Sequence, residues 1–158
     1  MSFKHFDCIF CRTRLTWFAH LYKACFKQYH RELSKPLSIF IPDRGVVFDV
    51  GAHAGQFAKL FAHLAPNGKI YSIEPSEYAL SILKLALKIN QLSQVTVINT
   101  GLSDFNGEAT LNIPIKESGS VGFGLSHIEK SSVPKKEKTV QQTIRVATLD
   151  SVVSKLEL

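Results

Sequence analysis

Hydrophobic and polar positions predict an α/β core in the middle of this chain. Three short apolar runs are rich in Val and Ile, which is typical of strands buried in a parallel sheet. Between them, apolar residues recur three and four positions apart, which indicates helices. Ser76 can cap the second helix, and Glu77 favours its first turn. We expect strands at residues 46–50, 69–73 and 95–99, and helices at 56–64 and 76–90.

The apolar positions of each predicted helix define the side that we expect to be buried against the sheet. In the first helix these positions are Phe57, Leu60, Phe61 and Leu64. In the second helix they are Tyr78, Ile82, Leu85 and Ile89. Helices that bury such stripes between consecutive strands produce a βαβαβ order with a parallel sheet.

A further helical pattern precedes this core. Its apolar positions recur at steps of three and four, as on one face of a helix, and they are Leu15, Phe18, Tyr22, Cys25 and Tyr29. We expect this helix to end before Pro36. It would cap the domain or pack on a partner, and a helix lying on a membrane surface is the alternative.

The pattern changes after the third strand. Residues 107–114 alternate between apolar and polar, as in a half-exposed strand. Residues 116–142 are rich in Ser, Gly and Lys, so we expect a long mobile loop. Residues 143–146 read as a short strand, and Thr148 is placed to cap a final helix.

Charge is concentrated at the front of the chain. The 158 residues carry a net charge of +6, and residues 1–44 hold eight Lys/Arg and three Asp/Glu, a local balance of 8 − 3 = +5. A basic segment can touch nucleic acid or anionic lipid, although a solvated helix face explains it more simply, and we expect no nucleic-acid partner. Residues 15–22 are far shorter than the roughly 20 residues that span a membrane. With no secretory signal pattern either, a cytoplasmic location is expected.

The cysteines also lie in the front segment. Cys8 and Cys11 have the spacing of half a zinc site, and His5 and His20 are near in sequence. A structural zinc site usually needs a second close pair of ligands. Three cysteines, including Cys25, form a poor disulfide framework, so we expect ordinary thiols and no metal.

The most informative stretch is the glycine-rich turn after the first strand, FDVGAHAGQ at residues 48–56. Dinucleotide-binding folds use GxGxxG at this point, but Ala and His follow Gly51 here, which disfavours an NAD enzyme. The chain instead holds Asp49, Gly51 and Gly55, which suits a nucleoside ligand without a diphosphate, such as S-adenosylmethionine. Glu74 ends the second strand, where a carboxylate can accept hydrogen bonds from ribose hydroxyls.

With these features the chain resembles the FkbM family of S-adenosylmethionine-dependent methyltransferases. The matching stretches are FDVGAHAGQFAKLFA, YSIEPSEYALSILKLALKIN, VTVINTGLSDFNGEATLNIP and VATLDSVV. The resemblance implies a Rossmann-like class I methyltransferase core. It also implies O-methyl transfer to a hydroxyl of a small molecule or glycan.

The resemblance assigns cofactor-binding roles to seven residues. Asp49, Gly51 and Gly55 would shape the pocket for the methionine part, and Glu74 would hold the ribose. The alternative for Asp49 is a buried acid that satisfies backbone donors, and the glycines could simply serve a tight turn. Glu74 lacks a comparable alternative, because an acid before a proline at a strand end gains little structurally.

Three assignments remain: His53 lies in the glycine-rich turn, and Ser103 and Asp104 follow the third strand. Ser103 and Asp104 would flank the adenine, with Asp104 accepting from its exocyclic amine, although Asp104 could instead cap the turn at 104–107. His53 stands where the family often has Asn, and it is expected to be a loop residue rather than a base. The sequence does not identify a catalytic residue.

The resemblance also predicts more chain than is present. We expect a basic helical segment at residues 1–44 and a partial S-adenosylmethionine-binding domain at 45–158, incomplete in its C-terminal half. The first strand would then lack one neighbour, and an exposed apolar edge invites pairing. A partner chain or self-association could cover it, whereas residues 143–146 are not expected to. A catalytically inactive fragment or interaction module is the alternative function.

Overall fold

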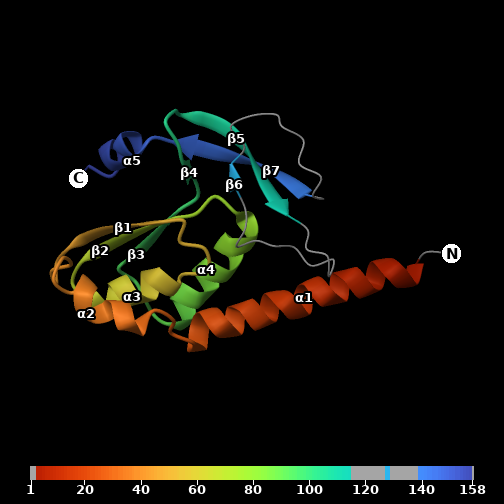
Figure 1. The fold of residues 1–158 in the computed structure, drawn as a ribbon, viewed down its shortest axis with the longest axis horizontal. Coiled ribbons are helices and arrows are strands. Elements are labelled where there is room, and N and C mark those ends of the chain that lie inside the picture. The colour runs from red at the N-terminus through yellow and green to blue at the C-terminus, as the bar shows by residue number, and fades with distance from the viewer. Residues whose placement is uncertain (1–2, 115–126, 129–138, 158) are drawn as a thin grey trace.

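The computed structural model describes residues 3–114, 127–128 and 139–157, with side chains for 14–114 and 140–157. Two sheets lie one above the other in Figure 1, with α3 and α4 beneath the first sheet and α1 along the bottom. The helices are α1 (Phe3–Phe26), η1 (Arg31–Leu33, a 3-10 helix), α2 (Ser34–Leu37), α3 (Gln56–Leu64), α4 (Glu77–Ile89) and α5 (Leu149–Lys155). The strands are β1 (Val46–Val50), β2 (Lys69–Ile73), β3 (Val95–Ile98), β4 (Gly101–Leu102), β5 (Gly107–Pro114), β6 (His127–Ile128) and β7 (Thr139–Ala147).

The first sheet has the order β1-β2-β3, and all three strands are parallel. Val47 lies opposite Ile70, and Ile70 lies opposite Val95. Val95 and Val97 pack against a buried cluster that α4 dominates, so α4 covers this face. The predicted βαβαβ order and the parallel sheet are confirmed.

Strand β1 forms an edge of this sheet. Among the described residues it pairs only with β2, and β7 pairs with β4 and β5 instead. Val46 and Val50 are 50% and 57% exposed, so the burial expected for a strand of a parallel sheet is wrong for these two residues. The apolar run therefore predicts the strand correctly, but within the described chain this strand has a neighbour along only one of its two edges.

The second sheet has the order β4-β7-β5-β6. Strand β5 coincides with the alternating stretch at 107–114 and pairs antiparallel with β7 along its whole length. Strand β7 is longer than the predicted 143–146, so residues 139–142 belong to a strand and not to a loop. Residues 127–128 form β6, and the rest of the predicted loop lies outside the described residues.

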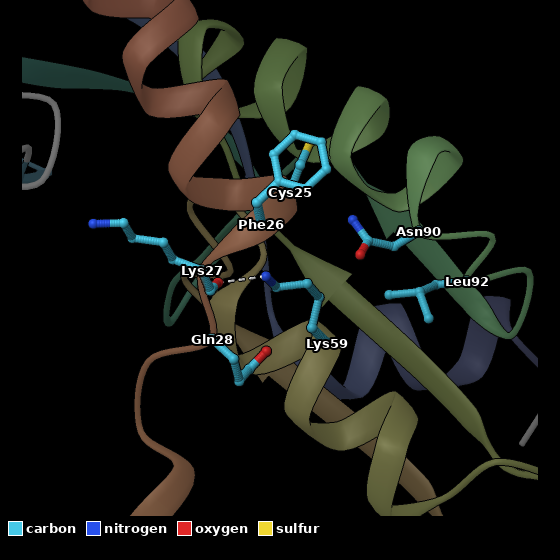
Figure 2. A pocket seen from close by; sticks show the side chains of 7 residues that line it. All are labelled: Cys25, Phe26, Lys27, Gln28, Lys59, Asn90 and Leu92. Atoms are coloured by element: carbon cyan, nitrogen blue, oxygen red, sulfur yellow. Dashed lines mark hydrogen bonds between the residues drawn. The ribbon is translucent and has the colours of Figure 1, made fainter.

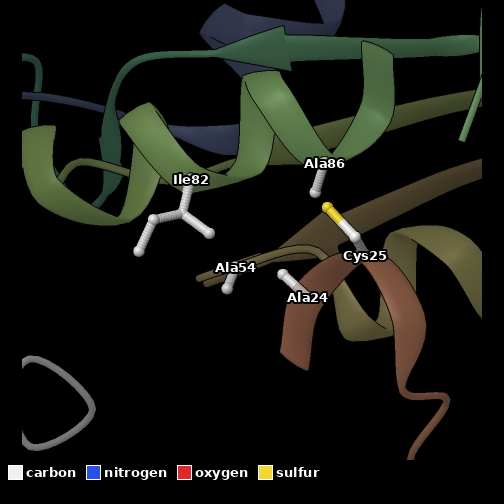
Figure 3. Close-up of a cluster of buried hydrophobic side chains, with 5 residues drawn as sticks. All are labelled: Ala24, Cys25, Ala54, Ile82 and Ala86. Carbon is white, nitrogen blue, oxygen red and sulfur yellow. The ribbon is translucent and has the colours of Figure 1, made fainter. Parts of the chain in front are cut away.

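Helix α1 is held on α4 by small side chains near its C-terminus. Ala24 and Cys25 are buried against Ala86, Ile82 and Ala54 (Figure 3), with the Cys25 sulfur directed toward Ala86. Small residues at a crossing let two helices approach closely, because no large side chain separates their backbones. The predicted helical cap is therefore present.

The face of α1 that packs differs from the predicted one. Of the five positions expected on the packing face only Cys25 is buried, while Leu15, Phe18 and Tyr22 are 59–66% exposed. The packed side instead contains Trp17 and Leu21, together with the alanine and cysteine described above. Helical spacing alone fits two opposite faces here, and the close approach at Ala24 selects the one with the smaller residues.

The buried sides of α3 and α4 are also only partly as predicted. In α3 the buried residues are Ala58, Leu60 and Ala62, while the phenylalanines are only half-buried. In α4 the buried residues are Ala79, Leu80, Ile82, Leu83, Ala86 and Leu87, and Ile89 is 46% exposed. The sequence pattern identified large apolar residues as the core, yet alanine dominates where helix, loop and sheet meet closely.

The helix ends follow the local sequence. The Ser76 hydroxyl accepts from the Ala79 N–H, and the Thr148 hydroxyl accepts from the Ser151 N–H at 3.2 Å. Asn90 is the C-terminal cap of α4. The predicted caps at Ser76 and Thr148 are confirmed, because each depends on residues within one turn.

A matched pair of glycine substitutions tests the loop between β1 and α3. Gly51 and Gly55 both have positive φ, 74° and 86°, but a Cβ on Gly55 would lie 2.6 Å from Cδ1 of the fully buried Leu83. A Cβ on Gly51 would meet nothing within 4 Å. We expect Gly51→Ala to cost about 1–2 kcal/mol from backbone strain. Gly55→Ala should cost about 1–3 kcal/mol more from overpacking.

Urea unfolding of both variants measures this difference. Equal losses of stability in the two variants would contradict the close contact between Gly55 and Leu83. Because both substitutions add the same methyl group, the difference between them isolates the space around each position.

Candidate functional site

The candidate site lies where β1 and β2 end, at the carboxyl edge of the parallel sheet. The loop at residues 51–55 crosses this edge and is fixed to β2, because Gly51 N and Ala52 N donate to Ile73 O at 2.9 and 3.1 Å. Ligands of open α/β sheets bind at this edge, where loops and helix N-termini expose backbone groups. The loop is therefore positioned by the sheet rather than by its own sequence alone.

Glu74 connects two parts of this edge. The residue is 7% exposed, its Oε2 accepts from His53 N at 2.9 Å, and its Oε1 accepts from Ser76 N at 2.8 Å. The expectation that this acid gains little structurally is therefore wrong, because the carboxylate joins the glycine loop to the start of α4. Each carboxylate oxygen can accept more than one hydrogen bond, so capacity for ribose hydroxyls remains.

Asp49 is a buried acid beside Ser72 on the neighbouring strand. The two residues are partners in the β1–β2 register, and Asp49 is 6% exposed. Burial raises the pKa of Asp49 from 3.8 to about 6, while the Ser72 hydroxyl and the Ala58 backbone oppose the rise and the charge of Glu74 adds to it. Among the described residues, neither Asp49 Oδ2 nor Ser72 Oγ makes a hydrogen bond of acceptable geometry, so the serine acts only as a nearby dipole.

His53 occupies an unusual backbone position in this loop. Its φ is 47°, in the left-handed region that Asn, Asp and His adopt more readily than most residues. Its Nε2 is buried and has no hydrogen-bond partner in the described part of the chain.

The glycine loop at residues 51–55 has one side that suits a polar ligand. Three buried polar atoms, on Asp49, Ser72 and His53, lack partners among the described residues. The exposed Gly51 borders open space, whereas Gly55 packs on α4 and leaves no room. Unpartnered buried polar groups are costly in a folded protein and are often explained by a ligand or water.

Ser103 and Asp104 lie at the start of the second sheet. Ser103 N donates to Ala147 O at 2.9 Å, which continues the pairing of β4 with β7. Ser103 Oγ donates to Asp104 Oδ1 at 3.0 Å, and Asp104 is exposed in the turn before β5. The structure thus brings Asp49, His53 and Glu74 together and holds Ser103 and Asp104 through the other sheet.

A polar cavity between the two sheets, lined by Pro75 after Glu74, includes residues that the sequence did not single out. It has a volume of about 390 Å³, and its lining is Pro75, Glu77, Asn99, Glu108, Gln142, Thr143, Ile144 and Arg145. Two of these lining residues are hydrogen-bonded, since Asn99 Nδ2 donates to Glu77 Oε1 at 2.9 Å. The position of Asn99 directly after β3, at the carboxyl edge of the sheet, is a signal that could have identified it.

A second cavity lies away from this edge, where the end of α1 meets α3 and α4 (Figure 2). It has a volume of about 230 Å³ and is lined by Cys25, Phe26, Lys27, Gln28, Lys59, Asn90 and Leu92. Lys59 Nζ donates to Lys27 O at 2.7 Å, and burial lowers the pKa of Lys59. None of the predicted cofactor-binding residues lines this cavity.

The described residues contain neither a cluster of metal ligands nor a membrane-spanning helix. Within that part of the chain, no group of three His, Cys, Asp or Glu side chains could hold a metal ion. The side chains of Cys8 and Cys11 lie outside the described residues. In the described ranges, no helix has the length and apolar character needed to cross a bilayer.

The parallel βαβαβ sheet and its glycine loop define a Rossmann-like methyltransferase core. The model of the methyltransferase FkbM domain matches residues 49–157, which is most of the chain. The chain therefore belongs to the FkbM methyltransferase family, as the sequence motifs predicted.

Several solved methyltransferase structures are similar to this chain. They include a methyltransferase FkbM from Methylobacillus flagellatus (18% identity, 70% of this chain and 23% of that one, TM-score 0.44). A precorrin-6y C5,15-methyltransferase from Geobacter metallireducens has 23% identity over 48% of this chain and 42% of that one, with a TM-score of 0.40. An rRNA methylase from Streptococcus thermophilus has 21% identity over 48% and 41%, with a TM-score of 0.41. The chain spans less than half the length of each, and no curated protein matches it.

Asp49→Asn tests the burial of the carboxylate through the pH dependence of stability. Because the folded protein holds this proton up to about pH 6, wild-type stability declines as pH rises from about 4 through 6. The variant lacks that decline. It should exceed wild-type stability by roughly 3 kcal/mol at neutral pH and by little near pH 4. Urea unfolding across this range measures the difference, and a constant difference at every pH would contradict the raised pKa.

Proposed function

We propose that this chain forms the S-adenosylmethionine-binding part of an O-methyltransferase that acts on a hydroxyl of a small molecule or glycan. The observation that carries the proposal is the open glycine loop around the unpartnered polar atoms of Asp49, Ser72 and His53, next to the carboxylate of Glu74. Membership of the FkbM family supports the same cofactor.

The proposed roles follow from the position of each residue. Asp49 supplies negative charge beneath the loop and attracts the cationic amino group of the cofactor, directly or through water. Gly51 lets the backbone approach the methionine part, because no side chain fills the space above it. Glu74 keeps its two backbone hydrogen bonds and accepts further bonds from the ribose hydroxyls.

We assign the adenine of the cofactor to the second sheet and the cavity beside it. Ser103 and Asp104 flank the adenine in this proposal, with Asp104 accepting from the exocyclic amine. The polar cavity supplies space there, because it is lined by Pro75, which follows Glu74 in the chain, and by residues of β5 and β7. In this proposal, the polar side chains that line the cavity lie beside the adenine of a nucleoside whose ribose binds Glu74.

When bound, S-adenosylmethionine supplies a methyl group activated by the sulfonium charge. The chain must then hold the acceptor hydroxyl in line with that methyl group and receive or relay its proton. We assign no residue to the proton transfer. The contribution of the described residues is to bind and orient the cofactor.

A second candidate function is an interaction module that keeps the fold without turnover. The observation that favours it is the unpaired edge of β1 with exposed Val46 and Val50, which is suited to pairing with another strand. Detection of any methylated product from hydroxyl acceptors by mass spectrometry excludes this candidate. Methyl transfer that requires an added partner chain would mean that the edge completes an enzyme.

The role of Glu74 is tested with a cofactor analogue that lacks one of the two ribose hydroxyls. In wild type, the 2′-deoxy form of S-adenosylhomocysteine should bind at least tenfold more weakly than S-adenosylhomocysteine, because an acceptor loses its partner. In Glu74→Gln, S-adenosylhomocysteine itself should bind more weakly, and the penalty for the deoxy analogue should shrink. Isothermal titration calorimetry measures all four affinities.

Glu157→Gln is the matched control, because Glu157 is an exposed carboxylate after α5 that lines neither cavity. It should keep the full penalty for the deoxy analogue. If Glu74→Gln keeps that penalty as well, Glu74 only holds the loop and does not contact the ribose.

Asp49 also predicts a pH-dependent affinity for the cofactor. Below about pH 6 the carboxyl becomes protonated and no longer attracts a cation, so S-adenosylmethionine should bind about tenfold more weakly at pH 5 than at pH 7. Methylthioadenosine lacks the amino acid part and should show little change. Asp49→Asn should remove the pH dependence, and its persistence in that variant would assign it to another group.

A further inference from the structure

The solvent-facing side of α1 is apolar. Leu15, Phe18, Tyr22 and Phe26 are 59–69% exposed, and their spacing of three, four and four residues places them on one face of the helix. The rings of Tyr22 and Phe26 lie 5.3 Å apart, so they form one continuous patch. We call these four residues the outer face of α1. An exposed apolar patch of this kind marks an interaction surface.

The rotation of α1 is fixed, so the outer face cannot turn inward. On the opposite side Trp17 Nε1 donates to Ser81 Oγ at 2.8 Å, and His20 Nδ1 lies 2.9 Å from the Tyr78 hydroxyl. Ala24 and Cys25 are buried against α4 and the glycine loop (Figure 3). Because both hydrogen bonds and the cluster hold the same side, the outer face stays exposed in the described chain.

The charges beside the outer face have a single sign. Lys23 and Lys27 are exposed, and Figure 2 shows the Lys27 side chain directed away from the neighbouring cavity. Residues 14–31 contain four Lys/Arg and no Asp/Glu. A second copy of residues 14–31 would bring like charges together, because this segment holds no acid to offset them. The charge pattern therefore disfavours pairing of two outer faces.

We propose that the outer face of α1 docks on an anionic membrane surface. Aromatic and leucine side chains enter the boundary between headgroups and acyl chains, while lysines beside them pair with anionic headgroups. Helix α1 meets both requirements, with two phenylalanines and a tyrosine on the outer face and two exposed lysines next to it. The helix lies on the surface and does not cross it.

Vesicle sedimentation tests this proposal on the full chain. Wild type should sediment with phosphatidylcholine vesicles that contain roughly one-third phosphatidylserine, and much less with phosphatidylcholine alone. Replacement of both Phe18 and Phe26 by Gln should lower partitioning at least about tenfold, because the apolar contribution is lost. Replacement of both Lys23 and Lys27 by Gln should lower it about tenfold or more on anionic vesicles only.

Phe105→Gln is the matched control, because Phe105 is 49% exposed in the turn between β4 and β5, on the second sheet. It should sediment like wild type, and circular dichroism should show the same helix content in all variants. Equal sedimentation of wild type and the Phe18/Phe26 variant would overturn the proposal. The proposal would also be overturned if wild type did not sediment with anionic vesicles but self-associated through these phenylalanines, because the outer face would then bind a second copy.

Discussion

The buried carboxylate of Glu74 organises the functional edge of this protein. Its two oxygens accept backbone N–H groups from His53 and Ser76, which belong to different loops. Hydrogen bonds to a charged acceptor are stronger than those between neutral groups, especially where water is excluded. The glycine loop, which the sheet also holds through Ile73 O, is therefore joined to the start of α4 by one side chain, and the position of His53 depends on it.

The same edge contains polar groups that the described chain leaves without partners. Asp49, Ser72 and His53 each bury such an atom, and burial raises the pKa of Asp49 to about 6. Both features lower the stability of the protein compared with a fully satisfied edge. A ligand with a cationic group and several hydrogen-bonding groups would recover that loss, so the site is organised for binding at some expense of folding stability.

Helix α1 contacts this edge with one side and exposes its other side to solvent. Its Ala24 packs with Ala54, which lies in the glycine loop, so one end of the helix contacts the candidate cofactor site directly. The close packing of small residues on that side leaves the large apolar residues of α1 in solvent. One helix thus supports the loop with its inner side and offers an interaction surface with its outer side.

The sequence by itself determined the βαβαβ core, the glycine loop, the helix caps at Ser76 and Thr148 and the membership of the FkbM family. These features depend on residues close together in the chain, where turn chemistry and strand runs are readable. It also placed Asp49, His53 and Glu74 at one sheet edge, because parallel strands end on the same side.

Only the tertiary structure decided which helix faces are buried, because periodicity defines stripes but not the neighbours that cover them. It buried Ala24 rather than Phe18, and Ala58 rather than Phe57, where backbones approach closely. It also gave Glu74 its structural role, since the N–H groups of His53 and Ser76 reach one carboxylate only when two distant strands lie side by side.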